Sequence, residues 1–289
     1  MANNNVYQMV TDQIIKQLEN GVIAWHKPWS TAEGGAISYT SRKHYSFLNQ
    51  MLLGEAGEYL TFNEIERLGG KINKGAKAKF VVFYKMYKVV SKDEMVENAD
   101  GELEPKINTI PLLRYYKVFN VKDTDLSSKI KAPETFDTKT AEEIDNVIMD
   151  YVMREQIKFQ NDRHSDKAFY RRSTDEVVVP MAKQYKDVPE YYSTTFHELV
   201  HSTMLESRCN RMKENSLSFF GGEDYSREEL VAEIGSAMIC TKLGVAIEKS
   251  FKNSVAYIQS WIKALKNDPK MIVWASARAE KAADYILNV

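Results

Sequence analysis

The sequence predicts an α+β protein with two domains, an N-terminal mixed α/β domain and a mostly helical C-terminal domain with a small sheet. Three observations support this. The chain has 289 residues, about twice the roughly 150 residues typical of one domain. Runs rich in Val, Phe and Tyr occur in the first half, whereas helical periodicity dominates the second. Residues 121–140 are rich in Lys, Asp, Ser and Thr, so we place a linker there and expect domains at 1–130 and 131–289.

The individual elements follow from hydrophobic periodicity and turn residues. Val6, Val10 and Ile14 recur at helical spacing, and Gly69-Gly70 closes a second, shorter helical pattern. The polar and acidic residues 91–105 indicate an exposed excursion between two strands. The expected elements, in chain order, are a helix over 6–20, a short helix ending at Gly69, strands over 80–90 and 112–121, a helix over 141–160, strands over 168–170 and 177–179, and three further helical patterns up to the C-terminus.

The composition is that of a folded protein without a strong overall charge. Hydrophobic residues make up 44% and charged residues 27%, which excludes disorder as the main state. The 39 basic and 40 acidic residues give a net charge of -1, so any binding of nucleic acid must be local. No apolar run approaches the roughly 18 residues of a spanning helix, and the N-terminus lacks a signal-peptide pattern. Together with only two cysteines, this predicts a cytoplasmic protein with no membrane partner.

The second half contains one sharp motif, His197-Glu198-Leu199-Val200-His201, which is an HExxH sequence. Asp187 can cap a helix that has Pro189 in its first turn, so the motif is expected inside a helix. Residues four apart share a helix face, and His197 and His201 can therefore bind one ion. Imidazole nitrogen suits zinc, which takes four ligands and keeps one position for water at a catalytic site. One further protein ligand is required.

We expect this third ligand on the helical pattern of residues 226–244. Glu229 and Glu233 share one face of this helix, and small residues beside them would allow a close approach to the HExxH helix. We assign Glu229 as the metal ligand and Glu233 as the acceptor of a hydrogen bond from a ligand imidazole. The reverse order stays open, because Ser226 and Glu229 could instead form a capping box. Cys209 is a weaker candidate, since a thiolate would make a more structural site.

Glu198 lies between the histidines but points away from them on the helix, so it is not expected to bind the metal. We expect Glu198 to act as the catalytic base: it would take a proton from the water that zinc activates and deliver it to the leaving amine of a peptide. Manganese or cobalt would also fit these ligands.

In these motifs the chain resembles the ArdC-type antirestriction proteins of plasmids, conjugative elements and phages. The segments that carry the resemblance are 197–201, 206–211 and 228–235 in the second half and 21–29, 59–62, 68–75 and 114–120 in the first half. The resemblance implies a C-terminal zincin-like metallopeptidase domain, an N-terminal single-stranded DNA-binding domain, and protection of incoming DNA from restriction. The family usually has Pro where this chain has Ala24 and an aromatic residue, commonly Trp, where it has Ser202, and neither departure touches the metal ligands.

A local basic field in the first half supports binding of nucleic acid. Between Arg67 and Lys92 there are eight basic residues and no acidic one, and Phe80, Phe83 and Tyr84 interleave with them. Aromatic faces stack on unpaired bases and lysines contact phosphates, which favours single-stranded DNA with little sequence preference. Strand alternation alone does not tell which aromatic side chains are buried. The expected DNA contacts are Trp25, Lys27, Arg42, Lys43, Lys71, Lys74, Lys77 and Arg114.

Three other functions stay open from the sequence alone. The zinc domain could be structural or non-proteolytic in a protein that only binds DNA. The chain could be a plain intracellular zinc peptidase, with the basic run as ordinary surface. A DNA-processing metalloenzyme is disfavoured, because two-metal nucleases need clustered carboxylates. For the leading interpretation, the substrate would be a host protein.

Overall fold

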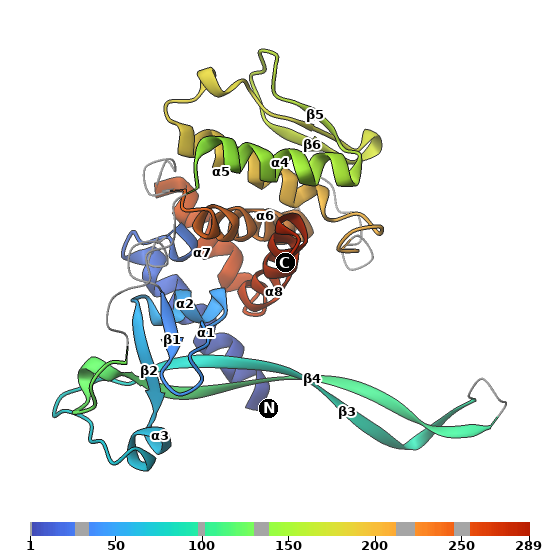
Figure 1. Cartoon of the computed structure of the whole chain (residues 1–289). Helices are drawn as coiled ribbons and strands as arrows, with labels where there is room; N and C mark the ends of the chain where they lie inside the picture. The colour runs from blue at the N-terminus through green and yellow to red at the C-terminus, as the bar shows by residue number, and fades with distance from the viewer. Residues whose placement is uncertain (1, 27–34, 98–101, 130–138, 212–222, 246–254) are drawn as a thin grey trace.

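The computed structural model describes residues 2–26, 35–97, 102–129, 139–211, 223–245 and 255–289, and its α+β architecture in two parts is the one predicted from the sequence (Figure 1). The N-terminal part comprises α1 (Ala2–Glu19), the 3-10 helix η1 (Ala24–His26), β1 (Ala36–Ser38), α2 (Phe47–Leu53), β2 (Gly57–Thr61), α3 (Phe62–Arg67), β3 (Lys79–Glu97), β4 (Leu103–Asn120) and the 3-10 helix η2 (Val121–Asp123). The C-terminal part comprises α4 (Ala141–Glu155), β5 (Lys158–Gln160), β6 (Phe169–Arg171), η3 (Arg172–Thr174), β7 (Glu176–Val178), η4 (Ala182–Gln184), α5 (Val188–Ser202), α6 (Glu223–Lys242), α7 (Val255–Asn267) and α8 (Met271–Leu287).

The N-terminal sheet has the strand order β1-β2-β4-β3, with β1 and β2 parallel and the other pairs antiparallel. β3 and β4 continue as a twisted ribbon far beyond the rest of the sheet (Figure 1). The excursion predicted over 91–105 is largely exposed over its described residues, but it does not interrupt the strands: they stay paired as far as Glu97 and Leu103, with a register shift between Val90 and Met95. Val90 and Leu103 are 58% and 67% exposed. A ribbon without a packed face needs no alternation of apolar and polar residues, which explains the misleading pattern.

The C-terminal part places a three-stranded sheet of order β5-β7-β6 beside its helices. Two predicted elements are corrected here. The helix expected over 141–160 ends at Glu155, because Gln156 adopts a left-handed conformation (φ 55°) and the chain then enters β5. The residues described after β7 form four α-helices rather than three. No helix in the described part of the chain combines the length and hydropathy that a membrane crossing requires.

The two parts share one hydrophobic core. Val10 and Ile14 of α1 belong to the same buried cluster as Leu265 of α7 and Ile272 of α8. α1 thus packs directly onto the C-terminal helices (Figure 1). The expected domain boundary at residue 130 lies outside the described residues.

The described start of the expected linker is folded rather than extended. Val121 and Thr124 are buried, and the backbone N–H of Asp125 donates to the carbonyl oxygen of Lys71. These contacts fasten residues 121–125 to the loop between α3 and β3, so a polar composition did not mark a free linker here.

The predicted close approach of α5 and α6 is confirmed. A Cβ atom at Gly235 would lie 2.9 Å from the side chain of Val200, so only glycine allows this contact without a shift. One residue further on, the Ser236 hydroxyl donates a hydrogen bond of 2.7 Å to the carbonyl oxygen of Ser193. This packing brings the acidic face of α6 up to the HExxH motif on α5.

Candidate metal centre

α5 carries both histidines of the HExxH motif on one face. The helix begins as predicted: the Asp187 carboxylate accepts a hydrogen bond of 2.9 Å from the backbone N–H of Glu190, and Pro189 lies in the first turn. One turn separates His197 from His201, and their Nε2 atoms lie 3.1 Å apart. The two rings therefore present nitrogen atoms to the same point in space.

α6 adds a carboxylate at that point. Glu229 Oε2 lies 3.5 Å from His197 Nε2, and Glu229 Oε1 lies 3.4 Å from His201 Nε2. Because α6 begins at Glu223, Ser226 lies inside the helix and not at its N-cap. The capping-box alternative for Glu229 is therefore wrong.

These three side chains have the spacing of ligands around one divalent ion. Their candidate ligand atoms all lie within 4.8 Å of one another. Tetrahedral bonds of about 2.0–2.1 Å place neighbouring ligand atoms about 3.3 Å apart, close to the separations between the two imidazoles and the carboxylate. Two imidazole nitrogens and one carboxylate oxygen also form the ligand set that a catalytic zinc site uses, with a position left for substrate or water.

His201 is held from its other side by Glu228, which the sequence analysis did not single out. Glu228 Oε1 lies 3.6 Å from His201 Nδ1. The guanidinium of Arg211 donates to both oxygens of Glu228, at 3.1 and 2.6 Å, and also to the carbonyl oxygen of Val200. A carboxylate that faces the remote nitrogen of a ligand histidine sets its tautomer and ring orientation. The role predicted for Glu233 at a ligand imidazole is thus taken by Glu228.

Glu233 turns instead toward the N-terminal part, where its Oε2 lies 3.4 Å from Nε2 of His26. The order of the two carboxylates was open from the sequence; the geometry brings Glu229, and not Glu233, together with both histidines. Two adjacent acidic residues, Glu228 and Glu229, could have suggested one metal ligand and one residue that orients a ligand histidine. Helical spacing alone does not show that Arg211 holds Glu228 in that position.

The charges around His201 favour its protonated form when no metal is bound. Burial alone would lower the pKa of His201, but the carboxylates of Glu228 and Glu229 outweigh it and raise this pKa to about 10. Burial likewise opposes ionisation of Glu229, but the two histidines hold its pKa well below the usual range. A metal ion must therefore displace a proton from His201.

Metal affinity is accordingly expected to rise with pH. One displaced proton makes the apparent dissociation constant fall about tenfold per pH unit below the pKa of His201. Zinc titration against a competing chelator at pH 6, 7 and 8 measures this, and calorimetry in buffers of different ionisation enthalpy counts the protons. Equal affinity at pH 6 and 8 with no proton release would contradict the assignment of His201.

Glu198 is buried next to this group without belonging to it. Burial raises the pKa of Glu198 even though His197 and His201 lower it, and its carboxylate accepts a hydrogen bond from the backbone of Tyr170 on β6. A carboxyl group with a raised pKa is a better proton acceptor and can return the proton later. This is the placement that the predicted general base requires.

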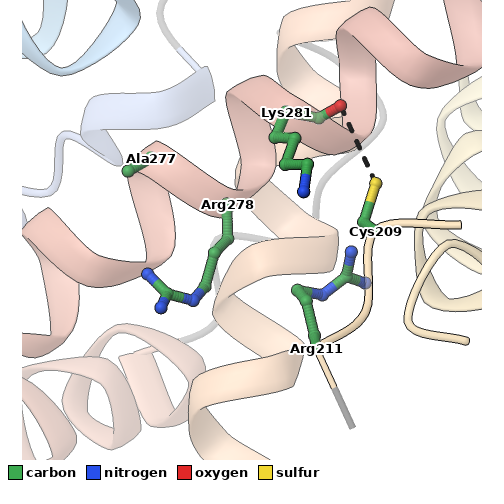
Figure 2. Close-up of a pocket in the computed structure, with 5 residues that line it drawn as sticks. All are labelled: Cys209, Arg211, Ala277, Arg278 and Lys281. Carbon is green, nitrogen blue, oxygen red and sulfur yellow. Dashed lines mark hydrogen bonds between the residues drawn. The ribbon is translucent and has the colours of Figure 1, made fainter. Parts of the chain in front are cut away.

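Cys209 lies away from the candidate ligands. Its thiol is within 3.9 Å of the carbonyl oxygen of Lys281 and lines a pocket of about 240 Å³ with Arg211, Ala277, Arg278 and Lys281 (Figure 2). Burial raises the pKa of Cys209, which disfavours the thiolate that metals bind. The alternative of a cysteine ligand is therefore wrong.

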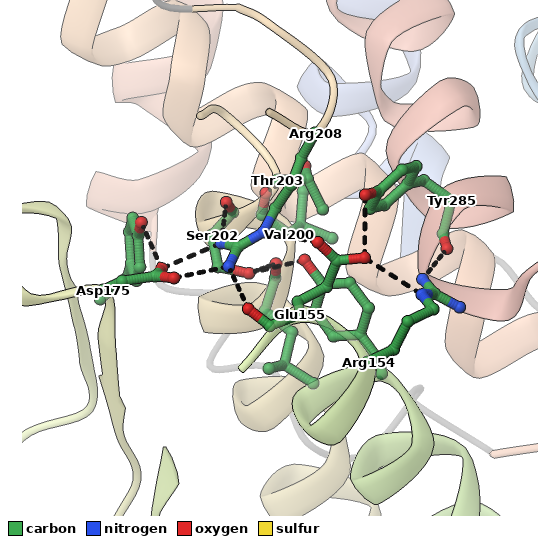
Figure 3. A network of polar contacts seen from close by, with 11 residues as sticks. Arg154, Glu155, Asp175, Val200, Ser202, Thr203, Arg208 and Tyr285 are labelled. Carbon is green, nitrogen blue, oxygen red and sulfur yellow. Dashed lines mark hydrogen bonds and ion pairs between the residues drawn. The ribbon is translucent and has the colours of Figure 1, made fainter. Parts of the chain in front are cut away.

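A second polar network holds the C-terminal end of α5 (Figure 3). Arg208 donates to Glu155 at the end of α4, to Asp175 before β7, and to the carbonyl oxygen of Ser202. Tyr285 of α8 donates to the same Glu155 carboxylate at 2.8 Å. Because Arg208 is only 3% exposed, this buried network ties α4, α8 and the turn before β7 to the helix that carries both histidines.

The residues expected to contact DNA have mixed placements. Lys27 lies outside the described residues. Lys43, Lys71, Lys74, Lys77 and Arg114 are exposed, and among the described residues the lysines of this group form no ion pair. Arg42 pairs with the buried carboxylate of Glu58, so its charge is already balanced.

The prediction for Trp25 was wrong. Its side chain is 1% exposed and packs edge-on against Trp261 of α7, with ring centroids 5.9 Å apart. The exposed aromatic side chains lie on the ribbon instead: Phe83 and Tyr116 are 53% and 46% exposed. Phe83 pairs directly across the strands with Arg114, so an aromatic ring and a guanidinium share one face.

Replacing Trp25 by Ala is accordingly expected to lower the free energy of unfolding by about 3–5 kcal/mol, because it leaves a large cavity between the two parts. Chemical denaturation measures this loss. The matched control Phe83→Ala removes an exposed ring and should leave stability nearly unchanged. A Trp25→Ala protein of unaltered stability but weakened DNA binding would restore the original assignment.

The fold and the three converging side chains define the class: a protein with a zincin-like metallopeptidase domain. A family model described as zincin-like metallopeptidase matches residues 148–278, and a model of the N-terminal domain of anti-restriction factor ArdC matches residues 4–119. The metal-free crystal structure of the antirestriction ArdC protein from plasmid R388 is 30% identical, with a TM-score of 0.70, 97% of this chain and 96% of that chain covered. Its Mn(II)-bound structure is 29% identical, with a TM-score of 0.71 and coverages of 98% and 97%. The chain belongs to the ArdC antirestriction family.

The curated relatives include two longer proteins. Two proteins named DNA primase TraC from Escherichia coli are 31% and 30% identical over 97% of this chain. The chain spans only 20% and 27% of their lengths. The similarity therefore concerns one segment of each TraC protein.

Proposed function

We propose that this antirestriction protein binds single-stranded DNA through its N-terminal part and a zinc ion through His197, His201 and Glu229, and that it hydrolyses a host protein in the cytoplasm of the recipient cell. The observation that carries the proposal is the convergence of these three side chains around one point, with Glu198 beside it. Manganese or cobalt suits the same donors. The Mn(II)-bound relative supports a divalent ion at this kind of site.

The residues of the site divide the chemical work between them. When bound, the metal supplies a Lewis acid that polarises a peptide carbonyl and acidifies water. Glu198 accepts the proton of the attacking water and returns it to the leaving amine. Glu228, fixed by Arg211, keeps the His201 ring in its binding orientation. The backbone of Tyr170 fixes the Glu198 carboxylate at the edge strand β6.

Binding of single-stranded DNA is supported by the chemistry of the N-terminal surface. Lys79 is engaged with Glu55 at 2.7 Å, whereas Lys71, Lys74 and Lys77 are exposed in the preceding loop. The ribbon adds the exposed rings of Phe83, Tyr84, Tyr115 and Tyr116. Cations that reach phosphates and rings that stack on bases are the two elements of sequence-tolerant binding.

The joint test is metal analysis of the purified protein together with titration of a fluorescent single-stranded oligonucleotide and of a duplex of equal length. We expect about one ion per chain. We expect tighter binding of the single strand, because a duplex hides its base faces. Equal affinity for both DNAs, or none at low salt, would leave a metal protein without this DNA function. DNA binding by a protein that takes up no metal would refute the peptidase half of the proposal.

Replacing Lys71, Lys74 and Lys77 together by Ala is expected to flatten the salt dependence of DNA binding. Each phosphate neutralised on a single strand contributes a slope of about -0.7, so losing three contacts changes the slope by about two units. DNA titrations at salt concentrations from about 50 to 300 mM measure this slope, because the screening of charges changes strongly over this range. The matched control replaces the exposed Lys167, Lys183 and Lys186 of the C-terminal part. If the triple variant of Lys71, Lys74 and Lys77 keeps the wild-type slope, or if the control variant changes the slope equally, the loop before β3 does not contact the DNA phosphates.

A further inference from the structure

A buried polar cluster joins the N-terminal part to the helix that carries Glu229. His26, in η1, lies against Glu233 of α6, with 3.4 Å between Nε2 and Oε2. The ring of Trp25 packs edge-on against that of His26 and against Trp261 of α7, and Tyr257 of α7 lies against the ring of Trp261. His26 and Trp25 are 8% and 1% exposed, and the side chain of Glu233 is 12% exposed, so little of the cluster meets bulk water.

Glu233 remains ionised in this setting. Burial opposes its charged form, but the adjacent His26 ring, 3.4 Å away, holds the pKa of Glu233 below its ordinary value, with Tyr257 assisting. A buried carboxylate without such partners would take up a proton or turn toward water. His26 therefore keeps a negative charge in place inside the protein.

That charge lies beside the candidate metal centre. Glu233 follows Glu229 by one helical turn on the same face of α6. A fixed negative charge one helical turn from a ligand carboxylate favours a cation at that site. The N-terminal part thus contributes to the electrostatics of a site built on the C-terminal helices.

We propose that His26 is a positioning residue of the metal centre: it holds the Glu233 carboxylate in place on α6, one helical turn from Glu229, and so strengthens metal binding from the N-terminal part of the chain. This inference rests on the proposed metal site. It assigns no contact between His26 and the metal.

The test uses the full-length protein and zinc, with affinity measured by chelator competition. His26→Ala is expected to weaken zinc binding by about 10- to 100-fold, the range for residues that orient ligands. His26→Gln keeps an N–H donor near the position of Nε2 and is expected to restore most of the affinity. His164→Ala is the matched control, because His164 is 70% exposed and should leave affinity unchanged. The absorption bands of a cobalt-loaded sample report the geometry of the site independently.

A double-mutant cycle separates positioning from general support of the fold. In a Glu233→Gln background, His26→Ala should change zinc affinity less than twofold, since it acts through the missing carboxylate. Zinc affinity within twofold of wild type in His26→Ala, even with a lowered melting temperature, would overturn the proposal. The proposal would also be overturned if the losses of zinc affinity from His26→Ala and Glu233→Gln were fully additive in the double variant.

Two further results keep the test decisive. If His26→Ala does not fold, the comparison of His26→Gln and Glu233→Gln decides: normal affinity in Glu233→Gln refutes the role. Failure of wild-type protein to bind zinc, manganese or cobalt would instead remove the metal site itself, and the proposed function with it. The two kinds of failure are therefore distinguishable.

Discussion

Replacing His201 by alanine is expected to reduce the metal content of the purified protein from about one ion per chain to none. A catalytic zinc site needs three protein ligands, and His197 and Glu229 alone cannot hold the ion against solvent. The substitution also leaves the buried carboxylate of Glu228 with Arg211 as its remaining partner. Mass-spectrometric metal analysis after dialysis measures the content, and circular dichroism checks that the variant folds.

The controls for this result come from the same chain. His164→Ala changes an exposed histidine and should keep the ion. Glu229→Gln should weaken binding severely, whereas Glu233→Gln should weaken it by about 10- to 100-fold as an indirect effect. The opposite ranking would move the ligand to Glu233. Undiminished metal in both His197→Ala and His201→Ala would remove the site altogether.

Glu198→Gln is expected to abolish peptide hydrolysis while the protein keeps its metal and its DNA binding. The amide has nearly the same shape as the carboxyl group but cannot accept the proton of water, and loss of a general base costs about 10²- to 10⁴-fold in rate. Cleavage of casein or of a host lysate, followed by electrophoresis, measures activity. Unaltered cleavage in this variant would exclude Glu198 as the base.

The same variant separates hydrolysis from binding in the antirestriction function. Transfer of unmodified DNA into a restricting host can be compared for wild type and Glu198→Gln. If protection disappears with hydrolysis, the proposed peptidase carries the biology. Protection that survives would mean that binding of DNA or of a partner is sufficient, which favours the non-proteolytic alternative.

Local sequence predicted several elements because their causes are local. The cap at Asp187, the periodicity of α1 and the one-turn spacing of His197 and His201 depend only on residues a few positions apart. The misplaced end of α4 and the ribbon over 91–105 show where this fails. Neither the left-handed conformation of Gln156 nor a pair of strands without a packed face produces a recognisable residue pattern in the sequence.

The roles of the acidic residues on α6 needed contacts between distant segments. Helical spacing put Glu229 and Glu233 on one face of this helix, left their order open and indicated no role for Glu228. Arg211 recruits Glu228, His26 faces Glu233, and only Glu229 meets both histidines. Each of these partners comes from another element, so no spacing rule along α6 could distinguish the three.

By itself, the sequence determined the α+β class, the HExxH helix, the close approach of α6 through its small residues and the basic field of the first half. Helical spacing, the positions of small residues and the local charge are properties of short stretches of sequence. They stay the same however the helices and strands are arranged in space. Only the tertiary structure decided that Trp25 is buried, that Glu228 supports His201, and that His26 reaches Glu233. Burial and pairing depend on which surfaces the fold brings together, and here α1 and η1 pack on the C-terminal helices in one shared core.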